Sequence, residues 1–190
     1  MVVGEVAVET DVIIMGGGPG GYAAAIRLGQ LGKSVVLIEK DKLGGVCLNR
    51  GCIPSKALIH TANQFHRLND FEKMGIQLPQ EKTVVDLNVW QGWKKGIIFQ
   101  LNQGISHLCK ENGVTVVKGQ ATFLSDDRIG VETDGDFETY KFEHAIIATG
   151  SRPFIPSFLN VDGRYILDST TSLQLKEVPP SLSIIGGGYI

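Results

Sequence analysis

Residues 11–21 read Asp-Val-Ile-Ile-Met-Gly-Gly-Gly-Pro-Gly-Gly, an apolar run that stops at a cluster of glycines. A short β-branched run bounded by glycine is typical of a buried parallel strand followed by a tight turn. From Tyr22 to Leu31 the chain is rich in alanine and leucine, which predicts a helix that ends at Gly32. A second apolar run over 35–39 follows. The stretch therefore predicts a strand–helix–strand unit.

Two more helices are predicted further along the chain. Apolar residues repeat at helical spacing from Cys52 to about Leu68, after a glycine-bearing loop over 40–51. A longer amphipathic pattern runs from Val89 to Leu108, with Asp86 as its N-cap and Gly113 at its end.

Short apolar runs predict the remaining strands. A buried strand is expected over 114–117, and an alternating stretch over 121–142 predicts two antiparallel strands joined by a turn at 133–136. Another short strand is expected over 144–148, and 183–185 repeats the opening pattern of strand then glycines. The fold class is therefore α/β, with a parallel sheet, flanking helices and a small antiparallel excursion near 121–142.

The composition excludes several classes of protein. The 190 residues are 43% hydrophobic and 20% charged, which is ordinary globular usage. Eighteen Lys and Arg against 20 Asp and Glu give a net charge of −2, which argues against nucleic acid as a partner. The sequence holds no apolar run long enough to cross a membrane, and its first eleven residues contain no Lys or Arg. We expect a soluble, cytoplasmic protein.

Gly16, Gly18 and Gly21 form a G-x-G-x-x-G pattern between the first strand and helix. The first glycine permits the tight turn, the second lets a pyrophosphate approach the backbone, and the third lets helix and strand pack closely. Glu39 lies at the end of the second strand, where a carboxylate can accept hydrogen bonds from a ribose diol. Strand, helix and acid together predict a dinucleotide site.

Cys47 and Cys52 lie five residues apart, and Cys109 is distant. Two structural thiols, a zinc half-site and a redox disulfide are the alternatives. Zinc would need further ligands at paired spacing, and neither Cys109 nor the four His supply it, so no metal is expected. A redox pair fits best, with Cys52 at a helix N-terminus that favours its thiolate and Cys47 as the more accessible sulfur.

The cysteines lie within residues 44–56, G-G-V-C-L-N-R-G-C-I-P-S-K, which resembles the active-site signature of the FAD-dependent pyridine nucleotide–disulfide oxidoreductases. Within that family the sequence of this motif is similar to that of the dihydrolipoamide dehydrogenases. Residues 118–121, 148–153 and 186–190 also resemble family segments.

The resemblance implies a Rossmann-type FAD-binding domain and assigns roles to residues. Cys47 would form a mixed disulfide with a dithiol substrate, Cys52 would face the flavin, and Lys56 would lie near the flavin ring. The adenine side of FAD would meet Gly119, and Thr149 and Gly150 would lie beside the cofactor. The ADP half of FAD would be held by Gly16, Gly18, Gly21, Glu39, Lys40 and Gly45.

The implied parent reaction is oxidation of dihydrolipoamide to lipoamide, with electrons passing through the cysteines and FAD to NAD. The implied partners are the lipoyl domain of a 2-oxo-acid dehydrogenase complex and a second copy in a homodimer. Another FAD-dependent disulfide reductase, for glutathione, trypanothione or mercuric ion, is an alternative. A catalytically inactive FAD-binding or assembly fragment is another.

The sequence departs from the family pattern in two ways. Arg50 stands between the cysteines, where it either lowers a thiolate pKa or is a surface charge without a role. The chain also ends before a second G-x-G-x-x-G is complete, so we expect an N-terminal part of the enzyme. The expected division is an incomplete FAD-binding domain over 1–150, a connector over 151–181 and the start of an NAD-binding domain over 182–190.

Overall fold

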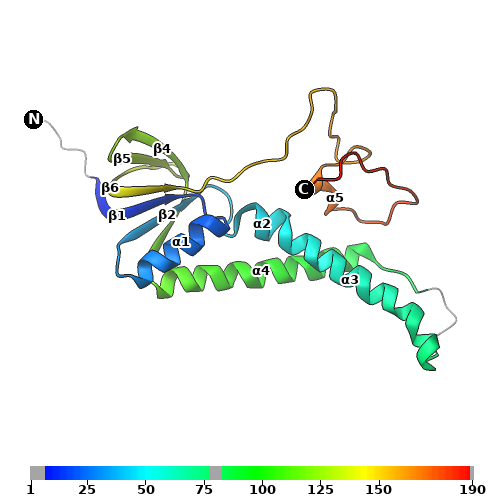
Figure 1. Cartoon of the computed structure of the whole chain (residues 1–190). Helices are drawn as coiled ribbons and strands as arrows, with labels where there is room; N and C mark the ends of the chain where they lie inside the picture. Colours follow the sequence, from blue (N-terminus) through cyan, green and yellow to red (C-terminus); the bar gives the residue numbers. More distant parts are fainter. Residues whose placement is uncertain (1–6, 78–82, 189–190) are drawn as a thin grey trace, which may run out of the picture. The chain divides into compact units, whose positions relative to one another are not determined.

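The computed structural model describes residues 7–77 and 83–188 (Figure 1). The chain divides into two compact units. One unit runs to Asn49 and resumes over Gln100–Ser151, and the other holds Arg50–Phe99 and the chain from Arg152 onward. Each unit has its own buried apolar core.

A six-stranded sheet forms the first unit, with the strands in the order β3-β2-β1-β6-β5-β4. The pairs β1–β2, β2–β3 and β1–β6 are parallel, while β5 and β4 extend the sheet in the antiparallel sense. The predicted parallel sheet with an antiparallel excursion is confirmed. The strands are β1 (Val8–Met15), β2 (Val35–Glu39), β3 (Val114–Lys118), β4 (Gln120–Ser125), β5 (Arg128–Glu132) and β6 (Phe137–Ile147).

The strand β6 differs from the prediction, which placed two separate strands over its length. Its first half pairs with β5, where Phe137 lies opposite Glu132. Its second half continues without a break beside β1, where Ile147 lies opposite Met15. One strand therefore serves both the antiparallel and the parallel part of the sheet. The turn predicted over 133–136 lies where expected, since Thr133 N donates to Asp136 O at 2.9 Å.

The strand β3 forms as predicted but is not buried as predicted. Val114 is buried, whereas Val116 is 40% exposed. The reason is its place at the end of the strand order, where β2 is its partner among the described strands.

Both faces of the sheet are covered by apolar side chains. On one face, Ile13 and Val36 of the parallel strands pack with Ile129 and Val131 of β5, so the antiparallel strands fold over the parallel ones. Residues of opposite parity, such as Ile14, point to the other face, where the helix α1 (Pro19–Gln30) packs. The predicted helix is confirmed, and Gly32 ends it with a φ of +76°.

The segment predicted as a loop over 40–51 contains a short helix, α2 (Gly45–Arg50). Gly44 and Gly45 have φ values of +86° and +57°, which turn the chain into this helix. Leu48 N donates to Gly44 O at 3.2 Å and closes the first turn. The glycine-rich composition led to the prediction of a loop where the structure has a short helix.

The second unit is built on helices. Asp86 caps α4 as predicted, because its Oδ1 accepts from the backbone N–H groups of Asn88 and Val89. Trp90 is buried and donates its indole N–H to Thr61 Oγ1 at 3.0 Å. The helices are α3 (Cys52–Phe71), the 3-10 turn Glu72–Met74, α4 (Leu87–Glu111, shared with the first unit) and α5 (Ser169–Ser172).

Within 152–188 the structure has one short helix, α5, and no described strand. The strand expected over 183–185 does not form in the described part of the chain, and Ile184 and Ile185 are 80% and 87% exposed. A strand needs a partner for its backbone groups, and no described strand offers one there. Residues 189 and 190, which belong to the repeated glycine motif, lie outside the described residues.

Candidate cofactor and dithiol site

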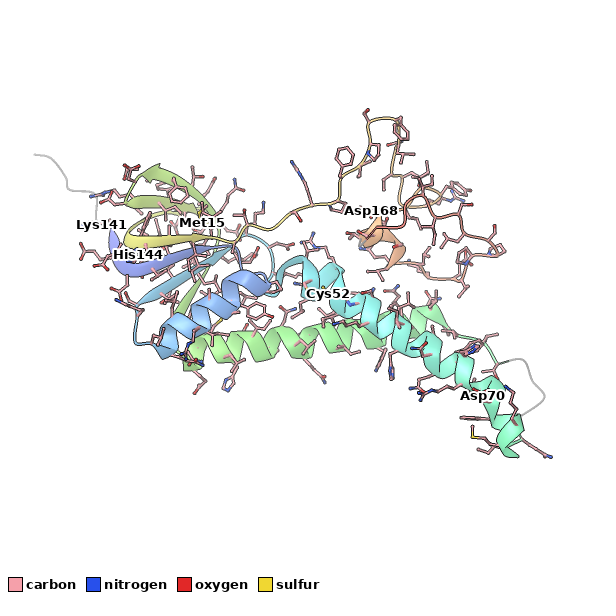
Figure 2. All side chains as sticks on the ribbon, in the orientation of Figure 1. Met15, Cys52, Asp70, Lys141, His144 and Asp168 are labelled. Carbon is pink, nitrogen blue, oxygen red and sulfur yellow. The ribbon has the colours of Figure 1, made fainter. Side chains whose placement is uncertain are left out.

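The carboxyl ends of four parallel strands meet at one edge of the sheet. Gly16 N, just after β1, donates to Ile38 O of β2 at 2.8 Å, and Ala148 N, just after β6, donates to Met15 O at 2.8 Å. Gly119 N, just after β3, donates to Glu39 O at 3.1 Å. Figure 2 labels Met15 at the end of β1. Ligands of open α/β sheets bind outside such strand ends.

Two glycines of the G-x-G-x-x-G pattern are required by close backbone approaches. A Cβ atom on Gly16 would lie 2.3 Å from Ala148 O, and the residue has a φ of +104°. A Cβ atom on Gly21 would lie 1.7 Å from Gly16 O. The third glycine therefore lets α1 pack against the turn, which is the role the sequence predicted for it.

Gly18 differs from these two because the space beside it is open. It is the N-cap of α1, and no side chain of the described residues caps this helix. Gly45 Cα, at 3.9 Å, is the one described heavy atom found within 4 Å of a Cβ built on it. The lack of a side chain at Gly18 lets a phosphate group approach the backbone at the start of α1, where a helix N-terminus favours an anion.

Glu39 joins the end of β2 to the glycine turn. Its Oε2 accepts from Gly17 N at 2.7 Å, and its Oε1 accepts from Asp41 N at 2.8 Å. Each carboxylate oxygen has a second lone pair, so the group retains capacity to accept from hydroxyls. Lys40, next in the chain, is exposed.

The helix α2 is seated directly on the glycine turn. Gly44 N donates to Gly17 O at 2.8 Å. A Cβ atom on Gly45 would lie 2.7 Å from Gly18 Cα. The loop that carries Cys47 and the turn that carries the first glycines are therefore one structural assembly within the first unit.

Cys47 and Cys52 are disulfide-bonded, and Cys109 is free and buried. Cys52 is the first residue of α3 and is labelled in Figure 2. As whole residues, Cys52 is exposed and Cys47 is half-buried, whereas the sequence predicted Cys47 as the more accessible of the two. The inward position of Cys47 follows from α2, which the sequence did not predict. Burial raises the pKa of the Cys109 thiol.

The other predicted site residues lie in both units. Thr149 and Gly150 follow β6 and are exposed, and Gly150 has a φ of +71°. Gly119 has a structural requirement of its own, because a Cβ atom there would lie 2.6 Å from Glu132 O. Lys56 belongs to the second unit, in the first turns of α3, and is exposed.

Three residues with a place in this assembly were not predicted. Gly17 contacts both Glu39 and Gly44 through its backbone. Asn49 accepts a hydrogen bond from Asn102 of α4, at 3.0 Å. The triple glycine and the asparagine between the cysteines were visible signals, but nothing in the sequence distinguishes Asn102 from other polar residues of α4.

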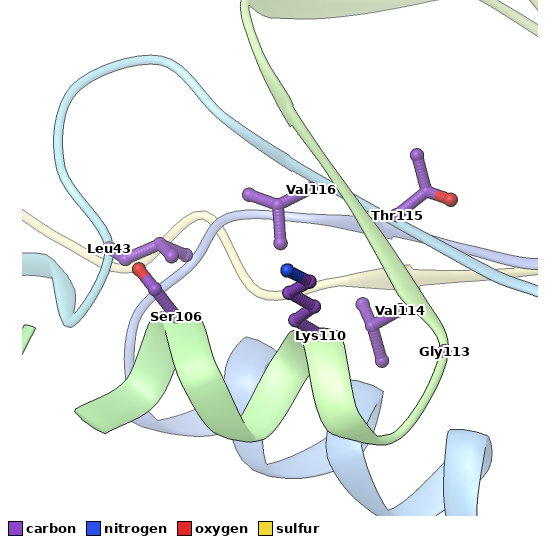
Figure 3. Close-up of a pocket in the computed structure, with 7 residues that line it drawn as sticks. All are labelled: Leu43, Ser106, Lys110, Gly113, Val114, Thr115 and Val116. Carbon is purple, nitrogen blue, oxygen red and sulfur yellow. The ribbon is translucent and has the colours of Figure 1, made fainter. Parts of the chain in front are cut away.

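A separate hollow of about 460 Å³ lies between α4 and the edge strand β3 (Figure 3). Its lining residues are Ser106 and Lys110 of α4, residues 114–116 of β3, and Gly113 and Leu43 outside these elements. Its described lining residues include none of the predicted site residues.

Within residues 7–77 and 83–188, no three His, Cys, Asp or Glu side chains gather as a metal site would require. In the same ranges no helix is both long and apolar enough to cross a bilayer.

Comparison with known families and sequences gives one consistent result. A family model described as pyridine nucleotide-disulphide oxidoreductase matches residues 10–190. The chain is 49% identical to a dihydrolipoyl dehydrogenase of Geobacillus stearothermophilus over 191 residues and 47% identical to one of Halobacterium salinarum over 194 residues. All of this chain is covered in both cases, and it spans 40% of each relative's length.

Solved structures share the fold. LpdA of Mycobacterium tuberculosis matches 90% of this chain and 38% of its own with a TM-score of 0.82, at 24% identity. The HOCl-induced flavoprotein disulfide reductase RclA of Escherichia coli matches 94% of this chain and 37% of its own with a TM-score of 0.75, at 30% identity.

Proposed function

Because this chain belongs to the pyridine nucleotide–disulphide oxidoreductase family, we propose that it carries the FAD- and dithiol-bearing part of a dihydrolipoyl dehydrogenase. The observation that carries the proposal is the seating of the cysteine-bearing helix α2 on the glycine turn, through Gly44 N and Gly17 O at 2.8 Å. Identities of 47–49% over the whole chain to dihydrolipoyl dehydrogenases support the same choice.

The residues at the strand ends fit the ADP half of FAD. The open space beside Gly18 at the start of α1 suits the pyrophosphate. Glu39 retains acceptor capacity for a ribose diol, and Lys40, Gly119, Thr149 and Gly150 border the same strand ends. FAD, when bound, accepts two electrons from the dithiol and passes them to NAD.

The cysteine pair carries out a thiol–disulfide exchange in this proposal. A thiolate of dihydrolipoamide attacks Cys47 Sγ, a new S–S bond forms, and the bond to Cys52 breaks so that Cys52 leaves as a thiolate. The second thiol of the substrate then attacks the substrate sulfur that is bound to Cys47, Cys47 is displaced, and the proton of the attacking thiol passes to Cys47 Sγ. The substrate leaves as the cyclic disulfide, and the protein retains two electrons as a dithiol.

The N-terminus of α3 favours Cys52 as the leaving thiolate. Cys52 is the first residue of this 20-residue helix, where the positive end of the dipole stabilises an anion. Lys56 lies four residues further on and is placed near the flavin ring in the proposal. Cys47 is therefore the sulfur assigned to the substrate.

The proposal extends to partners and location. The substrate is a lipoyl group carried by a 2-oxo-acid dehydrogenase complex in the cytoplasm, and the enzyme acts as a homodimer. Exposed Val89, Trp93 and Phe99 of α4 support the association, because apolar surface of this kind is normally covered. The division at 150 and 181 into FAD-binding domain, connector and NAD-binding segment belongs to the same proposal.

Anaerobic titration tests the function. The chain is mixed with FAD, freed of excess, and treated with dihydrolipoamide while the flavin absorbance is followed. We expect the chain to retain bound flavin, seen as a yellow colour, and dihydrolipoamide to bleach it. Cys47→Ser should also retain the flavin, but dihydrolipoamide should not bleach it. Absence of bound flavin would overturn the proposal.

Two other outcomes identify the alternatives. Bleaching by glutathione but not by dihydrolipoamide would indicate another disulfide reductase, the class to which RclA belongs by name. Flavin that binds and is bleached by neither thiol would indicate a catalytically inactive FAD-binding part.

A further inference from the structure

Asn49 lies in α2 between the two cysteines and binds the backbone at the start of its own helix. Its Nδ2 donates to Leu43 O at 2.9 Å and to Gly45 O at 2.8 Å. Two carbonyl acceptors fix the orientation of the amide, because only the NH₂ group can donate to them. The Oδ1 atom therefore faces away from this turn.

That outward oxygen is bound by a residue far away in the sequence. Asn102 Nδ2, on α4, donates to Asn49 Oδ1 at 3.0 Å, and both side chains are half-buried. The pair belongs to the first unit, as do Leu43 and Gly45. The side chain of Asn49 thus connects the turn before α2 to the 25-residue helix α4.

The other end of the connection is the glycine turn. Gly44, between the two carbonyls that Asn49 binds, donates its N–H to Gly17 O at 2.8 Å, and Gly17 N donates to Glu39 at 2.7 Å. A continuous series of hydrogen bonds therefore runs from the end of β2, through the turn before α2, to α4.

We propose that Asn49, held by Asn102, is a positioning residue that keeps α2, and with it Cys47, in place when the disulfide is open. The inference rests on the proposed function, in which the disulfide opens and closes in each turnover. A six-residue helix has little stability of its own, since isolated helices shorter than about 12 residues are marginal. The hydrogen bonds of the Asn49 side-chain amide restrain α2 when the disulfide is reduced and no longer does so.

The restraint has a measurable consequence for the disulfide. Holding α2 still raises the effective concentration of one thiol near the other and so favours ring closure. Without the restraint the reduced form gains conformational freedom. The equilibrium with an external dithiol then moves toward the reduced protein.

The experiment compares Asn49→Ala, Asn102→Ala and the double variant with the unaltered 190-residue chain. Each protein is equilibrated without FAD in buffers of defined dithiothreitol ratio, and the fraction of reduced cysteine pair is measured by alkylation and mass. Asn102→Ala, which removes the hydrogen bond to Asn49, should shift the equilibrium constant toward the dithiol by about fivefold, the size of one hydrogen bond. Asn49→Ala, which removes three hydrogen bonds, should shift it at least as far. The double variant should shift it no further than the larger single shift.

Matched variants separate positioning from a general loss of structure. Asn112→Ala removes an amide that donates to Leu108 O within α4, at 2.7 Å, and should leave the equilibrium unchanged. Asn49→Asp retains an acceptor for Asn102 but cannot donate to the two carbonyls, so it should not restore the unaltered behaviour. Asn102→Ala keeps helix propensity, so it remains informative if an Asn49 variant fails to fold.

The outcomes distinguish this inference from the proposed function. If the equilibrium constants of the Asn49 and Asn102 variants lie within twofold of that of the unaltered chain, the inference is overturned, even if dihydrolipoamide still bleaches the flavin. An equal shift in Asn112→Ala, or additive shifts in the double variant, would overturn it as well. If the variants shift the equilibrium constant but dihydrolipoamide does not reduce the unaltered chain, the positioning role of Asn49 is supported. The proposed substrate is then excluded.

Discussion

A Cβ atom on Gly45 would lie 2.7 Å from the Cα atom of Gly18, so the cysteine-bearing helix begins in direct contact with the N-cap of α1. Gly45 also has a φ of +57°, which a side chain makes costly. The dithiol segment and the glycine turn therefore cannot be altered independently.

Gly45→Ala should destabilise the protein and weaken FAD binding together. The added methyl group meets backbone rather than a movable side chain, and the left-handed conformation adds strain, for a loss of about 1–3 kcal/mol in unfolding free energy. Chemical denaturation and FAD titration measure the two effects.

Gly104→Ala is the matched control in the same unit. Gly104 lies inside α4, and none of the described atoms lies within 4 Å of a Cβ built on it. The substitution should raise the unfolding free energy by about 0.5–1 kcal/mol, because alanine is the stronger helix former. A Gly45 variant as stable as the Gly104 variant would contradict the packing argument.

Glu39→Gln should weaken FAD binding at least as much as it lowers stability. The amide has one oxygen where the carboxylate has two, so either Gly17 N or Asp41 N loses its acceptor, at about 1–3 kcal/mol. Calorimetric titration with FAD provides the measurement. Glu143→Gln, an exposed change on β6, should leave binding unaltered, and equal affinities in all three proteins would exclude a role for Glu39.

Cys109 should be the last thiol to react. Its side chain is fully buried, and burial raises the pKa of the thiol, so the reactive thiolate is scarce at neutral pH. In the oxidised native protein we expect labelling by a maleimide to be at least about a hundredfold slower than in denaturant, because it requires local opening. Rapid native labelling that is lost in Cys109→Ala would contradict the burial argument, and labelling that persists in Cys109→Ala would show that another sulfur reacts.

Tyr140 should make stability depend on alkaline pH. Burial, together with the hydrogen bond to Glu138 and its charge, raises the pKa of Tyr140 from 10.0 to about 12. The folded state therefore favours the protonated phenol. The contribution of this phenol to the free energy of unfolding is complete below pH 10 and is lost as the pH rises toward 12.

Urea unfolding of the unaltered chain and of Tyr140→Phe across this range measures the difference. The stability advantage of tyrosine over phenylalanine should shrink with rising pH. Parallel pH profiles would show that the phenol titrates alike in the folded and unfolded states.

Lys94→Met should release the segment around residue 173 in the second unit. Lys94 is buried, its Nζ donates to Leu173 O at 2.8 Å, and it lies 5.2 Å from the centre of the Trp90 ring. Burial, followed by the charge of Lys95, lowers the pKa of Lys94. Cleavage by trypsin after Lys176 should accelerate several-fold in the variant. Lys95→Met, an exposed neighbouring change, should leave the cleavage rate as it was.

Much of the fold could be read from local patterns. The first strand, α1 and β2 were predicted because apolar runs, alanine-rich helix and glycine stops follow one another within 30 residues. The helix α2 was not predicted, because it begins at two glycines with positive φ values and its first turn is bound by the side chain of Asn49, features that local composition does not reveal. Likewise, β6 is a single strand because it pairs with both β5 and β1. The sequence of β6 by itself does not reveal these two pairings.

The candidate site divides in the same way. Gly16, Gly18, Gly21, Glu39 and the two cysteines were predicted as site residues from the sequence, because their spacing along the chain forms recognisable motifs. Tertiary structure alone decided that Cys47 is half-buried, that Gly119 lies beside Glu39, and that Asn102 binds Asn49 across 53 residues. The physical reason is that a single hydrogen bond between distant residues imposes no periodicity or composition on the segments it joins. Only the tertiary structure brings the Asn102 amide of α4 within hydrogen-bond distance of Asn49.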